Sequence, residues 1–154
     1  MLTLECDPSM TDETTEASIP KWFKPVAIVA LIWNLMGLMA FGMYMTLDDQ
    51  AMEAAEYTTE QIEFFKTTPK WVNVAFAVGV VFGVAGSVML VMRKKPAYLL
   101  LAFSMCGVLA QCTWIFFLSD AAKIMGVGLS PITIIVSIAL TALSVTGVRK
   151  HWLT

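Results

Sequence analysis

Charged residues are confined to short segments of this chain, and long apolar stretches lie between them. Four stretches contain no Asp, Glu, Lys or Arg: residues 25–47, 71–92, 96–119 and 124–148. Each has at least 22 residues, and about 20 apolar helical residues cross a hydrocarbon core of roughly 30 Å. Backbone amides in lipid need partners within their own segment, so helices are the expected form. The pattern predicts four membrane-spanning helices at about residues 25–47, 71–92, 97–119 and 126–148.

Composition argues against a soluble helical bundle. The chain has 154 residues, of which 58% are hydrophobic and only 14% are charged, whereas soluble domains usually carry about 25% charged residues. Four uncharged helices would leave no polar face for water. The first stretch is also longer than the apolar core of a signal peptide, which has about 7–15 residues. We therefore expect an all-α membrane protein built as a four-transmembrane-helix bundle.

The first 20 residues differ from the rest of the chain. They are rich in Thr and Ser and carry five acidic residues without a basic one. This composition predicts a disordered acidic tail over residues 1–20, followed by the four-helix transmembrane domain over residues 21–154. The sequence is compatible with a translation start at Met1 or at Met10.

Basic residues predict the orientation in the membrane. With four crossings, seven of them fall on one side: Lys21, Lys24, Arg93, Lys94, Lys95, Arg149 and Lys150. Three fall on the other side: Lys66, Lys70 and Lys123. The positive-inside rule then places both termini in the cytoplasm. Trp22, Trp71 and Trp152 stand at the predicted membrane edges, where indole rings are common.

The longest connection, residues 48–70, contains signals for local structure. Thr58 followed by Gln61 fits a capping box, and Asp48 or Asp49 could cap a second helix. Pro69 ends the segment. We expect one or two short amphipathic helices in this first external loop. They would serve as a lid over the end of the bundle, or as a gate or docking surface.

Small residues recur at helical spacing inside the predicted spans. Gly79, Gly83 and Gly86 share one face of the second span, and Gly107 lies on a similar polar face of the third. Such residues let membrane helices approach closely. They predict a compact bundle, or a protomer that also packs against copies of itself.

Two amides near the middle of the membrane are the main candidates for function. Asn34 and Gln111 each need a partner or a wet cavity, because an unsatisfied amide in hydrocarbon costs several kcal/mol. One interpretation is an interhelical hydrogen bond. The other is a polar lining for the path of a small solute, with Trp33 and Trp114 as aromatic walls.

Several chemistries lack the residues that they require. The spans contain no carboxylate, Lys or His, which argues against a proton relay or ion-coupling site. Cys106 and Cys112 lie on different faces of one predicted helix, and His151 is the only histidine. The sequence therefore predicts no enzyme, no metal site, no cofactor and no nucleic-acid partner.

The motifs that remain carry a resemblance to a known family. They are Trp33-Asn34-x-x-Gly37, Pro69-x-Trp71, Arg93-Lys94-Lys95-x-Ala97-Tyr98 and, in the third span, Gln111. Together they resemble small bacterial four-span proteins that are often labelled sugar transporters, over residues 21–149. The resemblance implies a bacterial inner-membrane location. Pro96 departs from the family pattern, in which a bulky residue is expected.

Two functional hypotheses follow. The first is transport of a small, sugar-like solute of unknown identity by an oligomer. The second is a non-catalytic accessory or scaffold subunit of a larger membrane complex. A carrier should contain a polar cavity that reaches Asn34 or Gln111, whereas an accessory protein should have a dry core and an exposed stripe of small residues.

Overall fold

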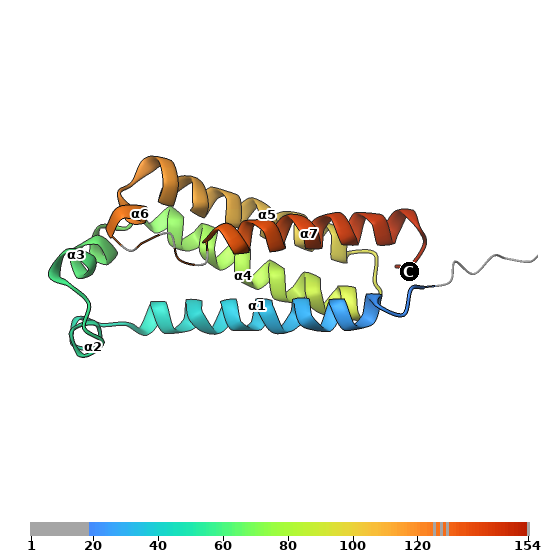
Figure 1. Cartoon of the computed structure of the whole chain (residues 1–154), viewed down its shortest axis with the longest axis horizontal. Coiled ribbons are helices and arrows are strands. Elements are labelled where there is room, and N and C mark those ends of the chain that lie inside the picture. Colours follow the sequence, from blue (N-terminus) through green and yellow to red (C-terminus); the bar gives the residue numbers. More distant parts are fainter. Residues whose placement is uncertain (1–18, 125, 127, 129, 154) are drawn as a thin grey trace, which may run out of the picture.

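The computed structural model describes residues 19–124, 126, 128 and 130–153, and these residues form helices without a strand. The elements in chain order are α1 (Phe23–Thr46), α2 (Asp49–Ala54), α3 (Thr59–Thr67), α4 (Lys70–Val91), α5 (Ala97–Thr113), the π-helical turn η1 (Trp114–Leu118), α6 (Ala121–Ile124) and α7 (Ser130–Arg149) (Figure 1). Four helices are long and apolar enough to cross a membrane: α1, α4, α5 continued by η1, and α7. The prediction of four apolar spans is confirmed. The tail over residues 1–18 and the choice of translation start lie outside the described residues.

The fourth span begins later than the sequence predicted. It was expected from about residue 126, but α7 starts at Ser130. Gly126 and Gly128 have φ angles of 76° and 51°, in the left-handed region that glycine adopts readily and a right-handed helix cannot include. Pro131 is accepted because it lies in the first turn, where a backbone N–H has no helical partner.

The long helices run along one axis and pack in chain order (Figure 1). The closely packed pairs are α1 with α4, α4 with α5, and α5 with α7. In the described part of the chain, α1 and α7 are not such a pair. The bundle therefore has α4 and α5 at its centre and α1 and α7 as flanking helices.

The face of α1 that carries Asn34, Gly37, Phe41 and Tyr44 packs against α4. Phe41 meets Phe76 edge to face, with ring centroids 5.0 Å apart. One turn further along α1, the Tyr44 hydroxyl donates a 2.9 Å hydrogen bond to Asn73 Oδ1. The opposite side of α1 exposes large apolar residues such as Met39, as expected of a helix face that meets lipid.

Glycines bring α4 and α5 into backbone contact. A Cβ atom built on Gly107 would lie 2.6 Å from the Gly79 nitrogen and 2.7 Å from the Ala75 oxygen. A Cβ on Gly86 would lie 2.7 Å from Leu101 Cγ. Within this interface the Ser104 hydroxyl donates to the Gly79 carbonyl at 2.6 Å. Small residues thus let hydrogen-bonding groups of two helices meet directly.

The two ends of the bundle differ in composition. One end, here called the loop end, carries α2, α3 and α6 (Figure 1). The other, here called the basic end, carries the start of α1, the turn between α4 and α5 and the end of α7. The seven basic residues counted above gather at this second end: Lys21, Lys24, Arg93, Lys94, Lys95, Arg149 and Lys150.

Candidate functional site

A cavity of about 380 Å³ lies among the four long helices. This volume falls within the range of roughly 300–1,000 Å³ that is typical of small-molecule sites. The cavity exists because α1 and α7 flank α4 and α5 without packing closely on each other, and because several facing residues are small. Its lining includes Trp33, Asn34, Gly37, Gly79, Ser104, Gln111, Cys112, Thr133 and Ser137.

Asn34 joins α1 to α4 at the edge of this cavity. Its Nδ2 donates to the Ala30 carbonyl at 2.8 Å and to Ser87 Oγ at 3.1 Å. Its Oδ1 lies directly over Gly83, where a Cβ atom would collide with it. The donor groups of this amide are therefore held within the protein, and Gly83 provides the space that the amide oxygen occupies.

Gln111 has a different environment from Asn34. It lines the 380 Å³ cavity and also a second pocket closer to the loop end. Among the described residues, its side-chain amide has no hydrogen-bond partner, and none of its polar atoms is both fully buried and unpaired. This amide is thus available to a molecule that occupies either space.

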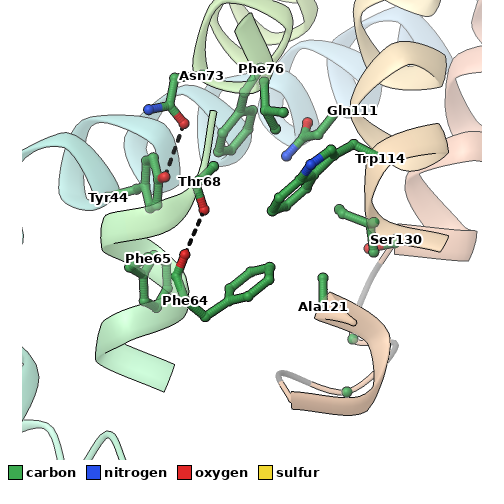
Figure 2. A pocket seen from close by; sticks show the side chains of 14 residues that line it. Tyr44, Phe64, Phe65, Thr68, Asn73, Phe76, Gln111, Trp114, Ala121 and Ser130 are labelled. Atoms are coloured by element: carbon green, nitrogen blue, oxygen red, sulfur yellow. Dashed lines mark hydrogen bonds between the residues drawn. The ribbon is translucent and has the colours of Figure 1, made fainter. Parts of the chain in front are cut away.

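The second pocket, of about 290 Å³, has five aromatic residues among the 14 that line it. Figure 2 shows Phe64 of α3 and Trp114 of η1 next to each other in its wall, with ring centroids 5.2 Å apart. The Tyr44–Asn73 hydrogen bond borders the pocket, and Thr68 Oγ1 donates to the Phe64 carbonyl at 2.9 Å (Figure 2). This outer pocket adjoins the inner cavity, since Phe76, Gln111, Ile115 and Ser130 line both.

The π-helical turn η1 positions Trp114 at this junction. It continues α5 from Trp114 to Leu118 and ends where Ser119 Oγ donates to the Trp114 carbonyl at 2.9 Å. Such wide turns are frequent at functional sites. Here the turn buries Trp114 against α3 and α6, where it packs with Val72, Phe64 and Ala121.

No Asp, Glu, Lys, Arg or His is among the described residues that line either space. The ion pairs Lys66–Asp49 and Lys123–Asp120 lie on the exposed surface of the loop end. There the hydrogen bond to Asp120 raises the pKa of Lys123. Within the described residues, no group of three or more potential metal ligands is present. Because an unpaired charge in an apolar site is strongly disfavoured, the lining suits an uncharged molecule.

The four residues singled out as lining do not share one wall. Asn34, Gln111 and Trp33 line the inner cavity, whereas Trp114 lines the outer pocket. Sequence reasoning missed Ser87, the partner of Asn34, and Asn73, the partner of Tyr44. Asn73 could have been found as a third amide within an apolar span. Ser87 lies 53 residues from Asn34, and nothing in the sequence links the two.

Comparisons with protein-family models, curated proteins and solved structures find no match to this chain. The functional argument therefore rests on the cavities and their lining.

Proposed function

We propose that this protein carries a small uncharged solute across the membrane, with the inner cavity as its binding site. The observation that carries the proposal is the junction of the two spaces at Gln111, whose amide has no partner among the described residues. A solute with hydroxyl, amide or ether groups would hydrogen-bond there and contact apolar walls elsewhere. A sugar-like molecule meets this description, as does any small neutral polar compound.

The alternative role as an accessory subunit is less well supported. An accessory subunit should have a dry core and an exposed stripe of small residues. Gly79, Gly83, Gly86 and Gly107 are all buried within the chain's own helix contacts. The core contains a cavity of ligand size that reaches both candidate amides.

Transport also requires an orientation and an assembly. We place the basic end in the cytoplasm, with both termini there, and the loop end outside, in agreement with the positive-inside rule. The inner membrane of a bacterium is the proposed location, from the family resemblance. Three pairs of long helices pack closely, but α1 and α7 do not pack closely on each other beside the cavity. The proposal therefore includes an oligomer in which neighbouring copies complete the cavity walls.

Uptake into proteoliposomes tests the proposal. The purified protein is reconstituted and assayed with radiolabelled uncharged solutes: glycerol, urea and a set of monosaccharides. For a transported solute, Gln111→Leu should reduce uptake roughly two- to tenfold, because one hydrogen bond contributes about 0.5–1.5 kcal/mol. Thr113→Val is the matched control, since Thr113 lies on the same helix, is exposed, and bonds only to the Leu109 carbonyl.

Asn34→Leu gives a second comparison. It removes the link to Ser87 and should lower the melting temperature in addition to any effect on uptake. Gln111→Leu should leave the melting temperature unchanged. If the folded wild-type protein takes up none of the solutes, the carrier proposal is wrong and the accessory role takes its place.

A further inference from the structure

At the basic end, the chain reverses direction after α7 and folds back over the bundle. The Trp152 N–H donates to the Gly147 carbonyl at 2.8 Å, and the His151 N–H donates to the Val148 carbonyl at 3.1 Å. This pair of bonds is the Schellman arrangement, and His151 supplies its left-handed residue with a φ of 56°. Residues 151–153, here called the plug segment, thereby turn toward the bundle axis.

The plug segment is buried, unlike the charged residues before it. Trp152 and Leu153 are only 7% and 1% exposed. The Trp152 ring meets Phe23 of α1 at a centroid distance of 5.7 Å, and Leu153 lies against Gly147 of α7. The segment therefore joins α1 and α7, the two flanking helices that do not pack closely along their length.

The apolar cluster that contains the plug segment also shares residues with the lining of the inner cavity. Leu101 and Leu140 belong to the cluster that contains the plug segment, and both also line the cavity. At the other end of the cavity, the outer pocket adjoins it directly.

We propose that residues 151–153 are a gate, which closes the cavity at the basic end and opens it when the segment leaves the α1–α7 gap. The purpose assigned to the gate rests on the proposed transport function. The segment is held in the closed position by this turn and by the contacts of Trp152 with Phe23 and Trp22, so opening has to break these contacts together. The turn places His151 in the left-handed region, which histidine adopts less readily than glycine does.

A cysteine inside the cavity provides the readout. Cys112 lines the cavity and is buried, whereas Cys106 is exposed. In a Cys6→Ser, Cys106→Ser background, Cys112 is the only thiol. Protein reconstituted in one orientation is treated from each side with a charged, membrane-impermeant methanethiosulfonate, and the rate of Cys112 modification is measured.

Two substitutions of His151 distinguish an open gate from a closed one. Proline cannot adopt a φ of 56° and has no N–H to donate, so His151→Pro should disrupt the turn while both plug side chains are kept. Glycine adopts this angle readily, so His151→Gly should keep the turn closed. We expect His151→Pro to raise modification from the basic end at least tenfold, with the rate from the loop end unchanged and His151→Gly equal to wild type.

A second variant tests the plug side chains themselves. Trp152→Ala with Leu153→Ala should also raise modification from the basic end, and the exposed pair Phe117→Ala with Leu118→Ala serves as the matched control. Unchanged modification from the basic end in His151→Pro would overturn the gate. A rise from both sides together, with loss of cooperative melting, would also overturn it, since the segment would then hold the whole bundle together. Cys112 modification needs no transported solute, so the gate and the transport function can fail separately.

Discussion

Gly107 and Gly42 show how differently two glycines act within this bundle. A Cβ atom on Gly107 would meet the backbone of α4 at 2.6 Å and 2.7 Å, and backbone atoms cannot move aside as a flexible side chain can. A Cβ on Gly42 of α1 would have nothing within 4 Å. One glycine sets the distance between two helices, and the other has no packing role among the described residues.

Substitution of these glycines tests that difference. Gly107→Ala should force α4 and α5 apart and destabilise the protein by about 1–3 kcal/mol, as overpacked cores generally do. Gly42→Ala should leave stability unchanged or raise it slightly, because alanine is the better helix former. Thermal unfolding in detergent, followed by circular dichroism, measures both. Equal melting temperatures for the two variants would contradict the close α4–α5 contact.

Asn34 and Gln111 likewise show that two residues of the same kind, here amides, act differently in this bundle. The sequence identifies both as amides that need a partner or a cavity. In the structure Asn34 bonds Ala30 and Ser87, while Gln111 faces the two spaces. Their roles diverge because Ser87 lies opposite Asn34 on α4, which depends on the register between two helices.

At the scale of the element, local signals in residues 48–70 act as expected. Asp48 accepts a 2.7 Å hydrogen bond from the Ala51 N–H at the start of α2. At the start of α3, the Thr58 N–H donates to Gln61 Oε1 at 3.0 Å and the Gln61 N–H donates to Thr58 Oγ1 at 3.3 Å. These contacts span three residues, so the sequence alone predicts them.

Loss of the cap should loosen α3 alone. Thr58→Ala removes the acceptor for the Gln61 N–H and should destabilise the helix by about 1 kcal/mol. That energy corresponds to roughly fivefold faster amide exchange. Hydrogen exchange of the protein in nanodiscs should therefore show faster exchange in α3 and no change in α4. Thr59→Ala is the control, because Thr59 is exposed and makes no capping contact. Equal exchange in both variants would argue against the cap.

At the scale of the whole molecule, the ends of the bundle differ in charge. Seven of the ten basic residues lie at the basic end, and the acidic α2 and α3 lie at the loop end (Figure 1). This separation arises because consecutive long helices are antiparallel, so the chain returns to the same end of the bundle after every second long helix. The charge asymmetry is the basis of the proposed orientation.

Labelling in intact cells tests that orientation. In a cysteine-free background, Gln50→Cys in α2 should react with a membrane-impermeant maleimide added outside, and Met92→Cys in the turn after α4 should not. Both positions are exposed, so access differs only by the side of the membrane. Permeabilised cells serve as the control, in which both should react. The reverse pattern would show that the basic end faces outward.

The sequence by itself determined the four apolar helices, the capped helices of the loop and the charge difference between the ends. All of these depend on residues close together in the chain, on helical rise and on the absence of charge in lipid. Only the tertiary structure decided that Asn34 bonds Ser87 while Gln111 faces a cavity, and that Trp152 is buried together with Leu153. Those outcomes depend on which helices pack together and in which register. Interlocking of small side chains across distant segments sets that register, and local pattern does not encode it.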